Sequence, residues 1–234
     1  MDRRNFSSAC LTVPATWMVL ATQRAHALSL GDLSAGDASS GIKAALEKGA
    51  NVAVGLLGRP DGFLGNPRVR IPLPGSLEKG VQMLRMVGQG DRIDELVNAM
   101  NRAAEQAVPA AKDLLIGAVR GMSVSDAKGI LTGGATSVTD FFVGKTRAPL
   151  TERFLPIVTT ATARVQLADK YNRIAGKASS MGLLKAEDAN LQRYVTGKSL
   201  DGLYLVIGDE ERKIRQDPVG SGSAILQKVF GALR

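Results

Sequence analysis

The spacing of apolar residues after position 40 is the feature that most constrains the fold. Along most of this stretch they recur three and four positions apart. The clearest case follows Asp91, where one face of the expected helix carries Ile93, Leu96, Val97, Met100, Ala104 and Ala107. This spacing is typical of α-helices that bury one side. Gly, Pro and capping residues divide the pattern into segments of helical length. The sequence therefore predicts one all-α, multi-helix, bundle-like domain over residues 41–234.

Several short signals support this helical interpretation. Ser123 followed by Asp126 is typical of a capping box at the start of a helix. Near the C-terminus, the pairs Asp209 with Lys213 and Glu211 with Arg215 stand four apart with the acid first. That order favours ion pairs along a solvated helix face. The Gly-containing stretch 123–135 is the best candidate for a seam within the domain.

One Pro-rich stretch, residues 59–75, interrupts the helical pattern. Within it, Val69, Ile71 and Leu73 alternate with other residues, as in extended chain with one buried side. Because its prolines lack amide hydrogens, the segment near 66–74 can take only a few forms. It can be an edge strand, one arm of a small hairpin, or polyproline-like chain lying on the helices.

The first 27 residues have the features of a cleavable export signal. Arg3 and Arg4 precede an apolar stretch over residues 10–21, and Ala25 and Ala27 form the small-x-small pattern that signal peptidase cuts. The stretch is shorter than the roughly 20 residues needed to span a bilayer. We therefore expect cleavage after Ala27, a periplasmic location and no stable transmembrane anchor. Residues 28–40, rich in Gly, Ser, Ala and Asp, are expected to form a flexible tether.

The leader partly matches the twin-arginine signal. Phe6 stands two positions after the arginine pair, as that pattern requires, whereas Ser7 replaces its usual second apolar residue. Arg24, just before the expected cut, also suits this route better than general secretion. We expect twin-arginine export; general secretion and an uncleaved N-terminal helix are the alternatives.

Cleavage would remove every residue type on which several common chemistries depend. Cys10, Trp17 and His26 are the chain's one cysteine, tryptophan and histidine, and all lie in the leader. The remainder cannot build a Ser-His-Asp triad, a Cys nucleophile, a structural zinc site or a His-ligated haem. It also cannot form a disulfide, so its stability must come from its apolar core. No cofactor and no metal is expected.

The charge of the remainder is mildly positive and dispersed. The chain has 30 Lys and Arg against 22 Asp and Glu; removing Arg3, Arg4, Arg24 and Asp2 leaves 27 against 21, or +6. A charge of this size, without a dense basic cluster, favours loose attraction to anionic surfaces. For an exported protein, membrane lipids or other envelope components come before nucleic acid, which we do not expect as a partner.

Two groups of polar residues are candidate ligand-binding positions. Asn101, Arg102 and Glu105 share the polar face of the helix after Asp91. They converge on a cleft for an anionic or amide-bearing ligand, or they form an ordinary surface pair with a solvated amide. Arg68 and Arg70 would share one side of the extended segment, where they bind a ligand or guard an exposed edge against aggregation.

Several segments, in the same order along the chain, resemble a known family. They are DGFL at 61–64 with NPRVRIPLP at 66–74, MNRAAE at 100–105, ILTGG at 130–134 and FLP at 154–156. Together they resemble an uncharacterised family of exported bacterial proteins catalogued as a domain of unknown function, over most of residues 40–232. The resemblance implies an all-helical fold and assigns no activity and no functional residue.

These observations favour a binding protein over an enzyme. We expect a non-enzymatic periplasmic protein that binds an amphipathic ligand or an envelope component. Met-containing helix faces can line an adaptable apolar cavity; the candidates are Met83, Met86, Met100, Met122 and Met181. One alternative is a carboxylate-dependent enzyme acting on an envelope substrate. The lack of tryptophan for stacking on glycans counts against it. A self-associating structural envelope protein is a third hypothesis.

Overall fold

The computed structural model describes residues 35–163, 166–182, 185 and 188–217. Within these ranges the chain forms helices, turns and loops but no strand. The predicted all-α class is therefore confirmed. The export signal and the remaining residues up to position 34 lie outside the described ranges, as do residues 218–234.

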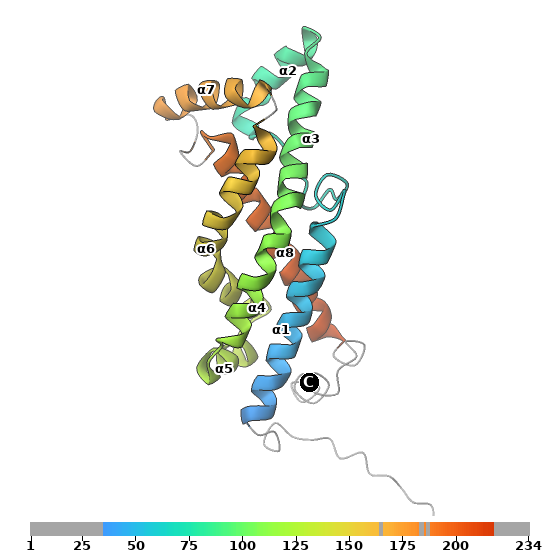
Figure 1. Cartoon of the computed structure of the whole chain (residues 1–234), viewed down its shortest axis with the longest axis vertical. Coiled ribbons are helices and arrows are strands. Elements are labelled where there is room, and N and C mark those ends of the chain that lie inside the picture. Colours follow the sequence, from blue (N-terminus) through green and yellow to red (C-terminus); the bar gives the residue numbers. More distant parts are fainter. Residues whose placement is uncertain (1–34, 164–165, 183–184, 186–187, 218–234) are drawn as a thin grey trace, which may run out of the picture.

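The molecule is an elongated bundle whose long helices run along its length (Figure 1). The long helices are α1 (Ala35–Leu57), α3 (Gly90–Ala107), α6 (Ser137–Thr162) and α8 (Leu191–Gln216), and the nine-residue α4 (Lys112–Arg120) runs in the same direction. A short 3-10 turn, η3 (Val108–Ala111), joins α3 to α4, so the two follow one another along the bundle. Helix α6 packs against α8 and α3, and α1 packs against α8 and α4.

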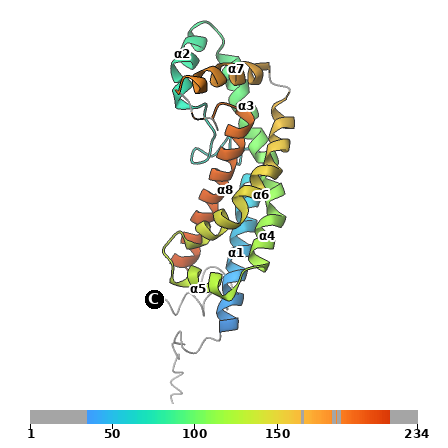
Figure 2. The ribbon, with the colours of Figure 1, turned by 90° about the vertical axis from the view of Figure 1, so that its left-hand side faces the viewer.

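The remaining helices of the described residues lie at the two ends of the bundle (Figure 2). At one end, α5 (Val124–Thr132) packs on α1 and α6. At the other end, α2 (Glu78–Met86) and α7 (Gln166–Ser180) both pack on α3, and α7 lies across the bundle axis. A second 3-10 turn, η2 (Gly75–Leu77), leads into α2. The stretch predicted as a seam thus contains α5 and the turn into α6.

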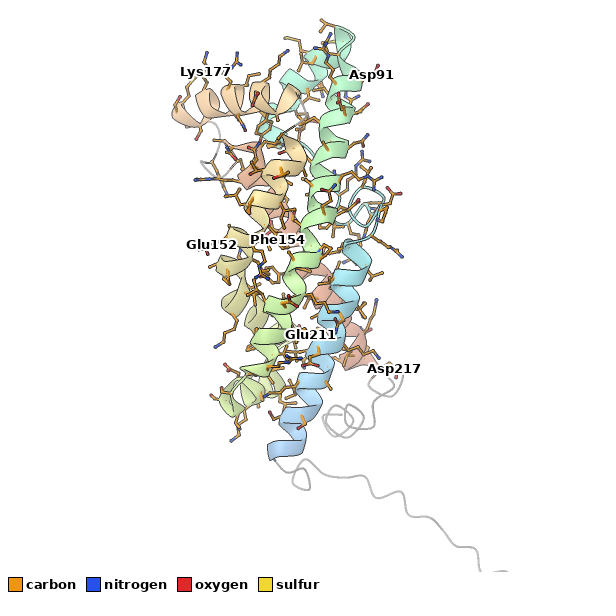
Figure 3. The ribbon with its side chains drawn as sticks, in the orientation of Figure 1. Asp91, Glu152, Phe154, Lys177, Glu211 and Asp217 are labelled. Atoms are coloured by element: carbon orange, nitrogen blue, oxygen red, sulfur yellow. The ribbon has the colours of Figure 1, made fainter. Side chains whose placement is uncertain are left out.

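The core between the long helices is mostly aliphatic, as the composition requires. Its largest fully buried side chains include Phe63, Phe142, Phe154, Leu57, Leu96, Met100, Leu115, Leu150 and Leu200. Phe154 lies midway along the bundle (Figure 3). The face predicted for the helix after Asp91 is buried as expected, except that Val97 is only half-buried. None of the helices in the described part of the chain is long and apolar enough to cross a bilayer.

Local capping chemistry explains where several helices begin and end. The predicted capping box at α5 is present: the Ser123 hydroxyl accepts from the Asp126 amide at 3.0 Å, and the Asp126 carboxylate accepts from the Ser123 amide. Gly88, with φ of 76°, lies in the turn between α2 and α3. A left-handed backbone of this kind favours glycine.

Two expectations about chain segments need correction. Helix α1 already begins at Ala35, so residues 35–40 are helical and the predicted tether does not reach position 40. Residues 66–74 form neither an edge strand nor a hairpin arm. Pro74, with φ of −54° and ψ of 133°, has the polyproline-like backbone that was the third alternative. Because this chain lies on the helices, its polar backbone groups need side-chain partners there.

Candidate functional site

Asn101 holds residues 58–74, the segment between α1 and η2 that we call the crossing loop. The Asn101 side chain is fully buried, and its Oδ1 accepts the Ile71 amide at 2.8 Å. Its Nδ2 donates to the Ile71 carbonyl at 3.0 Å and to the Val97 carbonyl at 2.8 Å. Both ends of the amide are therefore used, as a neighbouring strand would use its backbone. Asn101 thus supplies the hydrogen bonds to the Ile71 backbone that a neighbouring strand would supply in a sheet.

Glu105, one turn further along α3, holds the other half of the crossing loop. The residue is only 4% exposed, and its Oε1 accepts the amides of Phe63 at 3.0 Å and Leu64 at 3.1 Å. Its Oε2 accepts from Arg102 Nη1 at 2.7 Å, while Arg102 Nη2 donates to Asp61 at 2.8 Å. The hydrogen bond that Arg102 donates to Glu105 is the main cause that raises the pKa of Arg102. Both carboxylate oxygens thus have partners within the protein.

The structure separates the two predicted arginines. Arg68 forms an ion pair with Asp209 of α8, in which the second contact, Nη2 to Oδ1, is 3.1 Å. Burial alone would raise the pKa of Asp209, but hydrogen bonds and charge from Arg68 and Arg212 outweigh it and lower that pKa. Arg70 is exposed, and its charge helps to lower the pKa of Asp94 on α3. The pair therefore connects the crossing loop with two different helices.

The predicted polar residues hold backbone in place, and an apolar groove lies elsewhere. The groove is at the end of the bundle where α2, α3 and α7 meet, with a volume of about 170 Å³. We call it the α2–α7 groove. Its lining is almost entirely apolar: Leu73, Leu77, Val81, Leu84, Ile93, Leu96, Tyr171 and Ile174, with Gly80 and Lys170 completing it. An apolar pocket with one cation at its edge is suited to an aliphatic chain.

Large apolar side chains near this groove are exposed to solvent. The most exposed is Met86 at 80%, followed by Met181, Val87, Met83 and Ile174, all above half. They belong to α2, the turn after it, α7 and the turn after that. Of the methionines considered as cavity residues, Met100 and Met122 are instead core residues. Clustered apolar exposure of this kind marks sites of binding or association.

Two tyrosine hydroxyls near the α2–α7 groove form hydrogen bonds to backbone carbonyls of neighbouring segments. Tyr171 of α7 donates to the Asp188 carbonyl at 2.8 Å, and Tyr194 of α8 donates to the Pro72 carbonyl in the crossing loop, also at 2.8 Å. Burial, with a smaller effect from the Asp188 charge, raises the pKa of Tyr194 to about 12. Both hydroxyls are thus neutral donors at physiological pH.

The described residues contain no group of three or more His, Cys, Asp and Glu side chains that could hold a metal ion. Sequence reasoning did not find the groove, because its walls come from three helices and from chain next to η2. The apolar faces of α2 and α7 were visible as helical patterns. A helical pattern of apolar residues does not show whether other helices cover that face or whether it stays open to solvent.

A comparison with known protein families matches residues 32–231 to the family described as "Protein of unknown function (DUF4197)". The chain belongs to this family. The resemblance noted in the sequence is thereby confirmed, and the family's segments at 61–74 and 100–105 meet in the contacts between the crossing loop and α3. No curated protein and no solved structure matches the chain significantly.

Proposed function

We propose that this protein is a periplasmic binding protein that holds the aliphatic part of an amphipathic molecule in the α2–α7 groove. In this proposal the twin-arginine leader directs export and is cut after Ala27. The observation that carries the binding role is the apolar groove itself, whose wall includes Ile174, an apolar side chain that is 57% exposed. Lys170 at its edge suits a ligand whose polar end is anionic.

The size of the groove limits what it can hold. A dry apolar cavity of about 150 Å³ accommodates one benzene, so the groove has room for a group of about six carbon atoms. Burying six methylene groups contributes about 5 kcal/mol. Association costs about 4 kcal/mol or more. The aliphatic contact alone therefore gives weak binding, and a polar head group must add affinity.

The carboxylate-enzyme alternative has less support in the geometry. A catalytic carboxylate needs an oxygen that can reach substrate. Both oxygens of Glu105 accept from groups of the protein, two of them backbone amides. This residue therefore fits a structural role better than a catalytic one.

Docking on a lipid membrane is a second candidate, favoured by one observation. Met86, the last residue of α2, and Val87, the first residue after it, are 80% and 65% exposed, and the turn that joins α2 to α3 lies at the tip of the bundle (Figure 1). Lys177, on α7 at this same end (Figure 3), adds a cation. Exposed apolar side chains beside cations are typical of contact with an anionic membrane surface.

A glycine in the groove wall offers a direct test. Gly80 lines the groove, and a Cβ added there would meet no heavy atom within 4 Å. In Gly80→Leu, the new side chain is expected to occupy the groove and weaken decanoate binding at least tenfold without loss of stability. Gly117→Leu is the matched control, because Gly117 is also exposed, helical and open, but lies on α4.

Binding is measured on residues 28–234 by displacement of an environment-sensitive dye. Equal decanoate affinity in the two variants would reject the groove as the binding site. Sedimentation with phosphatidylglycerol vesicles separates the second candidate. Loss of vesicle binding in Met86→Ser/Val87→Ser, with decanoate binding unchanged, would support membrane docking through these two residues, separate from ligand binding in the groove.

A further inference from the structure

A second cavity, different in chemistry, lies between α6 and α8. Its volume is about 450 Å³. Its charged lining residues are Arg147 of α6, Arg193, Lys198 and Asp201 of α8, and Asp188 just before α8. Three cations against two carboxylates leave one surplus positive charge. We call it the α6–α8 cavity.

The cations of this cavity differ in how far they are already neutralised. Asp201 accepts from Arg147 Nη2 at 2.8 Å and lies 3.9 Å from Lys198 Nζ, so one carboxylate serves two cations. Lys198 also lies 5.9 Å from the centre of the Tyr194 ring, a cation–π distance that helps to fix its position. The Arg193 guanidinium forms no hydrogen bond or ion pair with the described residues. The surplus charge is therefore available to a ligand.

Thr196 supplies the second, independent observation. It lines the same cavity, is 1% exposed, and its hydroxyl has no hydrogen-bond partner among the residues that the structure describes. A buried hydroxyl left without a partner destabilises the folded protein, because it gives up its hydrogen bonds to water without replacing them. Helical threonines usually avoid this cost by bonding to the carbonyl four residues earlier, as Ser199 does on the same helix at 2.7 Å. Thr196 does not.

The space in front of these groups is open. A Cβ added to Gly197 would meet no heavy atom within 4 Å, although this glycine lies inside α8, as its seventh residue, and lines the cavity. Glycine in a helix interior is less stabilising than alanine. At this position it leaves the cavity wall without a side chain.

We propose that the α6–α8 cavity binds an oxyanion, with Arg193 and Lys198 as the main charge partners and the Thr196 hydroxyl as a hydrogen-bond donor. Oxyanions carry several acceptor lone pairs, which match guanidinium, ammonium and hydroxyl donors together. The site is argued from its own residues and does not depend on the α2–α7 groove. Free phosphate and the phosphate head of an amphipathic molecule share this chemistry.

Calorimetric titration of residues 28–234 with inorganic phosphate tests the site. Sodium chloride at equal ionic strength serves as the blank, because it screens charge without supplying an oxyanion. Wild-type protein is expected to bind phosphate, and Arg193→Gln to bind at least tenfold more weakly. Arg120→Gln, which removes the same charge from α4, is expected to bind as wild type. Absence of a phosphate-specific signal, or equal loss in both variants, would overturn the proposal.

Thr196→Val separates a binding role from a structural one. Valine keeps the shape and removes the buried hydroxyl without a partner, so the melting temperature is expected to stay or rise. Phosphate affinity is expected to fall about fivefold, as for loss of one hydrogen bond of about 1 kcal/mol. A folded Thr196→Val protein with wild-type phosphate affinity would contradict the assignment of this hydroxyl.

The source of the oxyanion is decided by comparing inorganic phosphate with dodecyl phosphate in the Gly80→Leu variant. Inorganic phosphate is expected to bind this variant as it binds wild type, whatever the fate of the groove. If dodecyl phosphate binds wild type more tightly than inorganic phosphate and loses that gain in Gly80→Leu, one amphipathic ligand occupies both cavities. If the two affinities are equal in wild type, free phosphate is the ligand of the α6–α8 cavity.

Discussion

The crossing loop and the α2–α7 groove both contact helix α3, but they differ in how far their side chains are used. The side chains under the loop have partners within the protein, whereas those of the groove face open space. In the crossing loop, buried side chains of α3 bond to backbone amides and carbonyls: Asn101 to Ile71, and Glu105 to Phe63 and Leu64. At the groove, apolar side chains from α2, α3 and α7 line open space. The side chains of α3 under the crossing loop therefore have hydrogen-bond partners within the protein, whereas the lining of the α2–α7 groove is left uncovered.

This difference separates the residues that hold the loop from the open surface proposed to bind a ligand better than residue type does. The charged and amide side chains of Asn101 and Glu105 were predicted to bind a ligand, but they hold a loop that has no regular structure. Such loops need side-chain partners because buried backbone groups cannot be left without hydrogen bonds. Ligands instead need surface that the fold leaves uncovered, and that surface is apolar and near α2 and α7.

The largest expected effect is from removing the buried carboxylate under the crossing loop. Glu105→Ala leaves two amides and the Arg102 guanidinium without their partner, and we expect a loss of about 3–4 kcal/mol in the free energy of unfolding. Glu105→Gln keeps one acceptor oxygen and should lose about 1–2 kcal/mol. Urea unfolding followed by far-ultraviolet circular dichroism measures both. A loss below about 1 kcal/mol in the alanine variant would show that the loop does not depend on this contact.

Two glycines on α8 differ in the space around them, one tightly packed against the crossing loop and the other without near neighbours. At Gly202 an added Cβ would lie 2.7 Å from the Phe63 ring and 3.3 Å from Val69 of the crossing loop. Gly202→Ala should therefore destabilise the protein by about 1–3 kcal/mol through overpacking. Gly197→Ala meets nothing and should stabilise it by about 0.5–1 kcal/mol. Opposite shifts in melting temperature are the expected result, and shifts of the same sign would contradict the contrast.

How much of this fold was predictable depends on how far apart the interacting residues lie. The helix after Asp91 and the Ser123–Asp126 capping box were predicted correctly, because both signals involve residues within a few turns. The ion pair between Glu211 and Arg215 is also confirmed, at 2.9 Å. The predicted Asp209–Lys213 pair is wrong. Asp209 pairs with Arg212 and with the distant Arg68, while Lys213 pairs with Glu210.

Buried carboxylates were beyond sequence reasoning for the same physical reason. Glu211, expected on a solvated face, is 4% exposed and lies inside the lower half of the bundle (Figure 3). Its oxygens accept the amides of Val138 and Thr139 at 3.1 and 3.2 Å, which satisfies the first turn of α6. The charge of a residue and its position in the helical period describe only its own helix, and they do not reveal which other segment packs against it. The partner amides belong to another helix more than 70 positions away.

A smaller, pH-dependent effect should appear at the tyrosine that bonds to the crossing loop. Tyr194 donates to the Pro72 carbonyl, and burial raises its pKa from 10.0 to about 12. A raised folded-state pKa gives stability that is present below pH 10 and is lost as pH rises from 10 through 12. Tyr194→Phe should lose about 1 kcal/mol at neutral pH and show a shallower alkaline decline. Parallel wild-type and variant curves above pH 10 would show that another group titrates.

The smallest effect on stability is expected where the groove region is most exposed. Met83 and Met86 are 63% and 80% exposed, so replacing both with serine should change the free energy of unfolding by no more than about 0.5 kcal/mol. The same double variant should bind less of an apolar fluorescent dye, because it removes exposed apolar surface from α2, the helix that forms one wall of the groove. Urea unfolding and dye titration on one protein sample test the two statements together. Unchanged dye binding would mean that exposure at this end does not recruit apolar ligands, and a large loss of stability would mean that these methionines are covered in solution. In either case the contrast between the loop and the groove would rest only on the residues that line the groove, such as Val81 and Ile174.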